Sequence, residues 1–131
     1  MTDNDLYLLA KKAFENSYSP YSKFRVGAAL LCEDGKVFTG CNIENATFGA
    51  TVCAERVAIF NAISQGERKL LRLAIASDSN DFTYPCGVCR QVIAEFNDDM
   101  VIIVGNNEGI RSHPISELLP YSFKFKNSED K

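Results

Sequence analysis

Two short motifs, widely separated along the chain, constrain its fold more than any other feature of the sequence. The first is Cys53-Ala54-Glu55, and the second is Pro85-Cys86-Gly87-Val88-Cys89. Three thiolates at this spacing can bind one metal ion, which requires the fold to bring both motifs to the same point. Three protein ligands leave the fourth tetrahedral position open, and this distinguishes a catalytic zinc site from a structural one. The pattern therefore predicts a metal-activated water, with Glu55 placed to transfer protons beside it.

The residues that follow each motif predict that both groups of cysteines lie at the start of a helix. Residues 52–64 have apolar side chains suited to a helix, with Gly66 as its terminator, and residues 86–96 have the same character. Cys86 and Cys89 then share one face of the second helix. Two helix N-termini would place their positive dipole ends next to the three thiolates.

The rest of the chain alternates between strand and helix patterns. A first helix is capped by Asp3 or Asn4, and a last helical turn covers residues 114–119. The segments with the apolar character of strands are 24–32, 36–41, 70–77 and 100–105. The nearly continuous apolar run in the first of them is typical of a strand that is covered on both faces. The expected fold class is α/β, a layered arrangement with a mixed sheet in a single domain over residues 1–131.

Two further cysteines lie in the predicted hairpin around Asp34-Gly35. A two-residue turn there pairs Cys32 with Val37 and Cys41 with Ala28, so that the two cysteines are not cross-strand neighbours. We interpret them as buried small hydrophobic residues. The alternative is a closed structural zinc site in which Cys32 or Cys41 is the fourth ligand.

Three thiolates and one zinc ion carry an excess negative charge that needs compensation. Arg56 and Arg90 each directly follow a motif, and a guanidinium can donate hydrogen bonds to thiolate sulfur. The helix N-termini are the other candidates for this role. The single histidine, His113, lies in a predicted turn, and we interpret it as a surface residue or a part of the local structure rather than a ligand.

Composition limits the partners and the compartment. The 131 residues are 46% hydrophobic and 24% charged, which is typical of an ordinary globular domain. The net charge of −3 provides no electrostatic footprint for nucleic acid, and no apolar run is long enough for a membrane span. The N-terminus is acidic rather than basic, and an odd number of cysteines indicates reduced thiols. We expect a cytoplasmic protein that acts on a small molecule.

The motifs and their surroundings resemble the small, zinc-dependent cytidine deaminases that work as homotetramers. The resemblance covers nearly the whole chain and includes residues 21–29, 40–46, 53–56 and 85–91. The cysteine motifs alone mark the wider deaminase superfamily. The Asn42-Ile43-Glu44-Asn45 segment narrows the match to free nucleosides, and a ligand set of three cysteines is similar to the tetrameric branch. The resemblance implies a three-layer α/β/α fold with a mixed five-stranded sheet flanked by helices.

The resemblance also implies a role for each matching position. The ligands of one Zn²⁺ per subunit would be Cys53, Cys86 and Cys89, with Glu55 as the proton shuttle. The substrate-binding residues would be Phe24, Asn42, Ile43, Glu44, Ala54 and Phe123. Of these, Asn42 and Glu44 would bind ribose hydroxyls, and Phe24 would pack against the nucleoside. Phe123 lies in the aromatic tail that would reach the site of a neighbouring subunit, and Arg56 would offset the charge of the thiolates.

The implied reaction is the hydrolytic deamination of cytidine and 2'-deoxycytidine to uridine and 2'-deoxyuridine, with release of ammonia, as in pyrimidine salvage. Glu55 would carry a proton from zinc-activated water to N3 of the ring and then protonate the leaving amino group. One alternative is a related deaminase that acts on a free base, a nucleoside antibiotic or an RNA. The other is a non-catalytic module with a closed zinc site.

Overall fold

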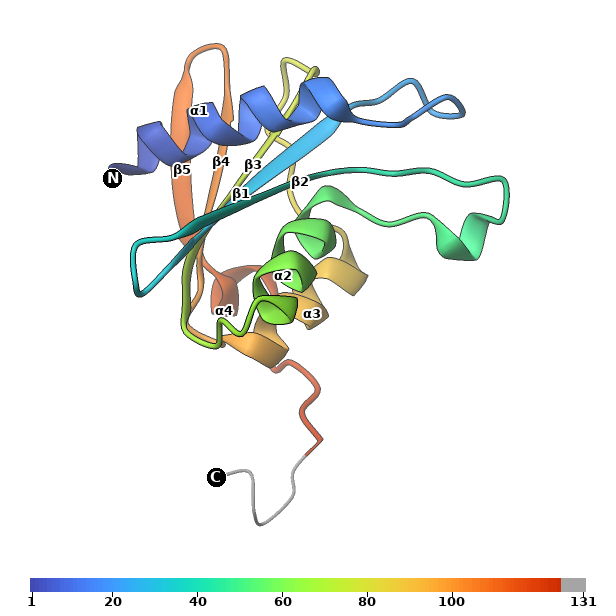
Figure 1. The fold of residues 1–131 in the computed structure, drawn as a ribbon. Helices are drawn as coiled ribbons and strands as arrows, with labels where there is room; N and C mark the ends of the chain where they lie inside the picture. The colour runs from blue at the N-terminus through green and yellow to red at the C-terminus, as the bar shows by residue number, and fades with distance from the viewer. Residues whose placement is uncertain (126–131) are drawn as a thin grey trace.

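The structure, a computed structural model, describes residues 1–125 and contains one mixed five-stranded sheet (Figure 1). The strands are β1 (Val26–Cys32), β2 (Val37–Cys41), β3 (Leu70–Ser77), β4 (Val101–Asn106) and β5 (Gly109–Pro114). Their order across the sheet is β2-β1-β3-β4-β5, and β3 and β4 are parallel while the other neighbours are antiparallel. The parallel pair needs a crossover connection, which the helix between these strands provides.

Helices cover both faces of the sheet and complete the expected α/β/α layers. On one face lies α1 (Asp3–Ala13), and on the other lie α2 (Ala54–Ser64), α3 (Gly87–Phe96) and α4 (Ile115–Leu118) (Figure 1). Two short 3₁₀ helices, η1 (Phe14–Asn16) and η2 (Phe48–Ala50), lie in the connections. No helix within residues 1–125 is both long enough and apolar enough to cross a membrane.

Strand β1 is buried over its whole length because helices cover both of its faces. Ala28 and Leu30 belong to the core cluster shared with α2 and α3, while Ala29 and Leu31 belong to the cluster shared with α1. Successive side chains of a strand point to opposite faces, so a strand between two helical layers has no polar side. The prediction of a doubly covered strand is confirmed.

Gly40 lets α2 lie directly against β2. A Cβ atom at this position would be 2.6 Å from the backbone nitrogen of Ala58 and 2.7 Å from the carbonyl oxygen of Ala54. Real Cβ atoms do not approach backbone so closely, and only glycine fits here. Because α2 begins directly after Cys53, this close packing also determines where the first motif lies.

The hairpin between β1 and β2 differs from the prediction by one residue. Val37 lies opposite Leu31 rather than Cys32, and the partner of Cys41 is shifted by the same amount. The loop between the strands has three residues, 33–35, instead of two, because Gly35 adopts a φ of 90°. Three-residue hairpin loops commonly place a left-handed residue at this position.

Strand β5 was not predicted, and His113 therefore lies in a strand rather than in a turn. The segment pairs with β4 at the edge of the sheet, and most of its residues are exposed, so it lacks an apolar pattern. The first helix also starts differently. Its N-cap is Thr2, which forms a capping box with Asp5, instead of Asp3 or Asn4.

Candidate metal centre and adjoining cavity

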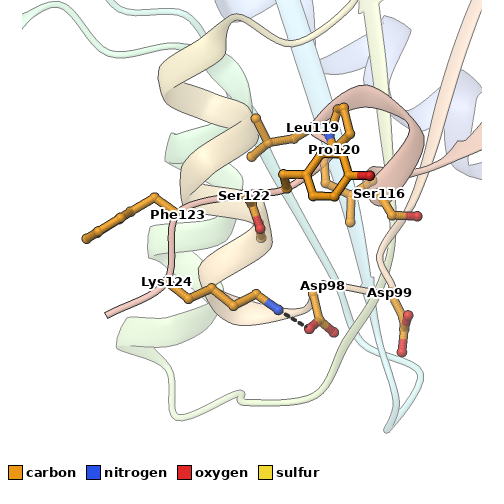
Figure 2. Close-up of a pocket in the computed structure, with 11 residues that line it drawn as sticks. Asp98, Asp99, Ser116, Leu119, Pro120, Ser122, Phe123 and Lys124 are labelled. Atoms are coloured by element: carbon orange, nitrogen blue, oxygen red, sulfur yellow. Dashed lines mark hydrogen bonds and ion pairs between the residues drawn. The ribbon is translucent and has the colours of Figure 1, made fainter. Parts of the chain in front are cut away.

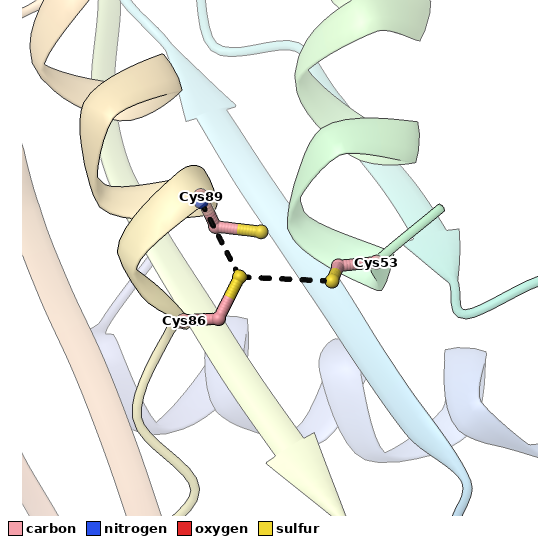
Figure 3. Close-up of side chains that lie close together, drawn as sticks. All are labelled: Cys53, Cys86 and Cys89. Atoms are coloured by element: carbon pink, nitrogen blue, oxygen red, sulfur yellow. Dashed lines mark hydrogen bonds between the residues drawn. The ribbon is translucent and has the colours of Figure 1, made fainter. Parts of the chain in front are cut away.

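The three cysteines of the two motifs converge between α2 and α3 (Figure 3). Their sulfur atoms lie within 4.8 Å of one another, and the Sγ atoms of Cys53 and Cys86 are 3.9 Å apart. Tetrahedral zinc with Zn–S bonds of about 2.3 Å requires sulfur separations of about 3.8 Å. The donor set therefore fits zinc. Within the described chain, neither Cys32 nor Cys41 belongs to this cluster, and a closed four-cysteine site is not supported.

Each motif places a cysteine at the N-terminus of a helix. Cys53 is the N-cap of α2 and Cys86 is the N-cap of α3. The backbone N–H of Cys89 donates to Sγ of Cys86 across 3.4 Å, a contact that an N-cap side chain typically makes. The prediction that two helix N-termini meet at the thiolates is confirmed, and their dipoles favour negative charge at this point.

The two arginines that follow the motifs have different surroundings. Arg56 donates from Nη2 to Sγ of Cys53 across 3.4 Å. Arg90 instead donates to two backbone carbonyls, those of Pro85 and Leu118, each across 2.7 Å. Of these two arginines, only Arg56 is hydrogen-bonded to sulfur, so Arg90 is not available for the compensating role considered from the sequence.

Glu55 lies in the first turn of α2 and is only 4% exposed. Burial raises the pKa of its carboxyl group to about 7, and the negative charge of Cys53 adds to this effect. The pKa of Cys53 falls to about 5, because the Cys89 thiol and the Arg56 guanidinium donate hydrogen bonds to its sulfur. The site thus combines a sulfur that is readily ionised with a carboxyl group suited to proton exchange near neutral pH.

A cavity of about 260 Å³ opens beside the sulfur cluster. This volume is slightly below the range of about 300–1,000 Å³ that is usual for small-molecule sites. The lining residues singled out from the sequence are Phe24, Asn42, Glu44, Cys53, Ala54, Glu55 and Cys86. Those missed are Ser22, Val26, Thr51, Val52, Thr83 and Tyr84. Four of the missed residues directly precede one of the two cysteine motifs, and this adjacency is the signal that could have identified them.

Hydrogen bonds of the Asn42 side chain link the end of β2 to the segment that carries Phe24. Its Oδ1 accepts hydrogen bonds from the backbone N–H of Val26, across 3.0 Å, and from the hydroxyl group of Ser17. Its Nδ2 donates to the carbonyl oxygen of Phe24 across 2.8 Å. The amide therefore holds Phe24 at the wall of the cavity.

Glu44 fastens the neighbouring loop in a similar way. Its Oε1 accepts from the backbone N–H groups of Tyr21 and Ser22, across 2.9 and 3.1 Å, and its Oε2 accepts from the Ser22 hydroxyl group. These hydrogen bonds, with that of the Ser22 side chain foremost, hold the pKa of Glu44 below its usual value. The carboxylate is therefore ionised at neutral pH where it faces the cavity.

Two residues of the predicted substrate set lie outside the cavity of their own chain. Ile43 is 42% exposed, and its backbone pairs with Val52. Phe123 is 71% exposed and lies in the tail, where residues 119–124 line a separate hollow (Figure 2). The tail is held along α3, since Gln91 donates to the carbonyl oxygen of Phe123 and Lys124 pairs with Asp98.

Comparisons with known proteins point to one family. A profile of the cytidine and deoxycytidylate deaminase zinc-binding region matches residues 1–105. The cytidine deaminase of Sporosarcina psychrophila is 51% identical over 87% of this chain and 85% of its own length. That of Halalkalibacterium halodurans is 46% identical over 96% of this chain and 99% of its own length. The crystal structure of cytidine deaminase from Burkholderia pseudomallei superposes with a TM-score of 0.90, at 42% identity over 94% of this chain and all of that one.

Proposed function

This chain belongs to the cytidine and deoxycytidylate deaminase family, and we propose that it converts cytidine and 2'-deoxycytidine to uridine and 2'-deoxyuridine with release of ammonia. The resemblance stated from the sequence is confirmed, and the chain is a zinc-binding hydrolase. The observation that carries the proposal is the convergence of three cysteine sulfurs and the buried Glu55 at one end of a small cavity. Such a reaction belongs to pyrimidine salvage.

The proposed chemistry assigns the proton transfers to Glu55. Zinc, when held by Cys53, Cys86 and Cys89, would supply a water of lowered pKa for addition to C4 of the pyrimidine. Glu55 accepts a proton from this water and donates it to N3, which makes C4 electrophilic. Glu55 then takes the second proton of the same water and delivers it to the departing amino group. Water and cytidine are thereby converted to uridine and ammonia, and Glu55 returns to its starting state.

We assign the ribose hydroxyl groups to Asn42 and Glu44. A carboxylate has about four acceptor positions, and three of those of Glu44 are occupied by the loop. The amide nitrogen of Asn42 has two hydrogens, and one is donated to Phe24. One acceptor and one donor remain, which is what a hydroxyl group needs. Phe24 at the cavity wall supports the assignment of the pyrimidine ring to its face, with the small Ala54 leaving room at the sulfur cluster.

We further propose that residues 1–131 form one domain that assembles as a homotetramer in the cytoplasm. Phe24, which lines the cavity, is exposed, and so are Tyr21 and Phe48, which line an adjoining hollow. Phe123 of a neighbouring subunit would complete each site, which agrees with its lying outside the lining of its own chain's cavity. The three ligand cysteines have to stay reduced to bind zinc, and this favours a reducing compartment. Light scattering of the zinc-loaded protein tests the assembly.

A substrate panel tests the proposed activity. Zinc-loaded protein is incubated with cytidine, 2'-deoxycytidine, free cytosine and a cytidine-containing single-stranded RNA, and ammonia release and ultraviolet absorbance are followed. Turnover of the two nucleosides with little reaction of the others is expected. Preference for cytosine or RNA would indicate another branch of the superfamily, and a zinc-loaded protein without any turnover would indicate a binding module.

A further inference from the structure

A chain of three side chains runs from the wall of the cavity to the surface of the protein. Tyr84 lines the cavity two residues before Cys86. Its hydroxyl oxygen is 3.2 Å from Nε2 of His113 in β5. Nδ1 of the same imidazole is 2.6 Å from a carboxylate oxygen of Glu117 in α4. The three residues come from three separate segments, and both nitrogens of the imidazole are engaged.

The chemistry of the Glu117 carboxylate sets the direction of its hydrogen bond to the imidazole. An ionised carboxylate only accepts hydrogen bonds, so Nδ1 of His113 carries the proton and donates it to Glu117. When the ring is neutral, Nε2 is an acceptor and the Tyr84 hydroxyl group donates to it. The His113 side chain is only 18% exposed, so competition from water at this junction is limited. Glu117 thus orients the imidazole, and the imidazole orients the tyrosine.

Strand β5 also contacts Phe82, which lies two residues before Tyr84. Arg111 and His113 are two apart and share one face of the strand. The Arg111 guanidinium lies 4.3 Å from the centre of the Phe82 ring, and the Tyr84 and His113 rings are 5.5 Å apart in an edge-to-face arrangement. Thr83, between the two aromatic residues, bonds instead to the Ser77 hydroxyl group across 2.5 Å. The loop that leads to Cys86 is therefore anchored by alternate side chains.

We propose that His113, oriented by Glu117, is a positioning residue that holds Tyr84 as the cavity wall against which the nucleoside binds. The role rests on the proposed function, since the ligand is the substrate or product of that reaction. His113 does not contact the reacting atoms and acts through Tyr84. A displacement of about 1 Å in a substrate-positioning group can cost about 100-fold in rate. Loss of the hydrogen bond that positions Tyr84 should therefore be measurable in the kinetics.

The single histidine allows a direct test by nitrogen NMR of untagged, zinc-loaded protein. One imidazole is present, and its two nitrogen resonances need no assignment to a residue. At a pH high enough for the ring to be neutral, we expect the pattern of an imidazole protonated at Nδ1. We also expect a clear shift of the Nε2 resonance in Tyr84→Phe, and a shift when saturating uridine is added. An imidazole with averaged tautomers that responds to neither change would overturn the proposal.

Steady-state kinetics provide the second test through a double-mutant cycle. Tyr84→Phe and His113→Ala should each raise KM for cytidine about fivefold to thirtyfold with full zinc content, as for the loss of one buried hydrogen bond. The KM of the double variant should be no higher than that of the more impaired single variant, since both substitutions remove the same contact. His113→Gln, which keeps a polar side chain, should recover part of the loss. Ser112→Ala, on the opposite face of β5, is the control and should keep the wild-type KM.

The outcomes separate this inference from the proposed function. Additive effects in the cycle, or a wild-type KM in both single variants, would show that the contact is only structural. A wild-type protein that does not deaminate cytidine would contradict the proposed function, yet the NMR pattern would still report whether Glu117 and Tyr84 orient His113.

Discussion

Arg56 donates a hydrogen bond to the sulfur of Cys53 across 3.4 Å, and no other arginine among the described residues does the same for a cysteine of the cluster. Three thiolates with one divalent zinc leave an excess of one negative charge, and the guanidinium places a positive charge directly against it. We expect a residue in this position to stabilise a bound metal through its ligand rather than by touching the metal itself.

Replacing Arg56 with glutamine should therefore weaken zinc binding. Loss of a partner of a metal ligand typically lowers metal affinity about 10- to 100-fold. Competition with a chromophoric chelator measures this change. Arg68→Gln is the matched control, since Arg68 lies beyond the far end of α2 and donates to backbone carbonyls. Equal zinc affinities of the two variants would contradict the compensating role.

Glu55→Gln should separate zinc binding from catalysis. The amide keeps the shape of the side chain but cannot accept and return a proton, so turnover of cytidine should fall by about two to four orders of magnitude. Zinc content, measured by atomic absorption, should stay at one per subunit. Glu95→Gln, on the exposed side of α3, is the control. Near-normal turnover in Glu55→Gln would rule out the proton shuttle.

Glu44→Gln should weaken the preference of the enzyme for nucleosides that carry ribose hydroxyl groups. The wild-type protein is expected to use cytidine much better than 2',3'-dideoxycytidine, because the latter has no hydroxyl group for Asn42 and Glu44. In the variant, KM for cytidine should rise toward that for the dideoxy compound, while kcat changes little. If the preference for cytidine persists unchanged, Glu44 serves only the loop through Tyr21 and Ser22.

Gly40→Ala should destabilise the fold and lower activity together. The added Cβ would meet the backbone of α2 at 2.6 and 2.7 Å and would push away the helix that starts after Cys53. Overpacking of this kind costs about 1–3 kcal/mol of unfolding free energy, which urea denaturation measures. Gly49→Ala, where nothing lies within 4 Å, should stay within about 0.5 kcal/mol of the wild type.

Phe123→Ala tests whether neighbouring subunits share a site. The variant should raise KM for cytidine, while its unfolding free energy stays near that of the wild type because the side chain is exposed. Mixing it with Glu55→Gln subunits under exchange conditions should restore activity, since the intact tail of one chain completes the intact site of the other. No gain on mixing, with confirmed exchange of subunits, would argue that each chain uses its own residues alone.

Local patterns predicted much of the fold and of the metal centre. The apolar run of β1, the β3 segment and the helices after both motifs are recognisable because their periodicity reflects burial on one or two faces. Strand β5 was missed because an exposed edge strand carries no such periodicity. The register of the β1–β2 hairpin was missed because a single left-handed residue, Gly35, changes the loop length.

The chemistry of the metal centre could be predicted from local sequence motifs alone. Cys53, Cys86 and Cys89 offer soft thiolate ligands at a characteristic spacing. Glu55 must lie close to them because it is two residues from the first ligand. Which arginine reaches a sulfur, Arg56 rather than Arg90, became clear only from the folded chain. It also decided that His113 meets Tyr84 behind the cavity wall. Contacts between distant segments depend on how helices and strands pack, and that packing is a property of the whole fold rather than of any local pattern.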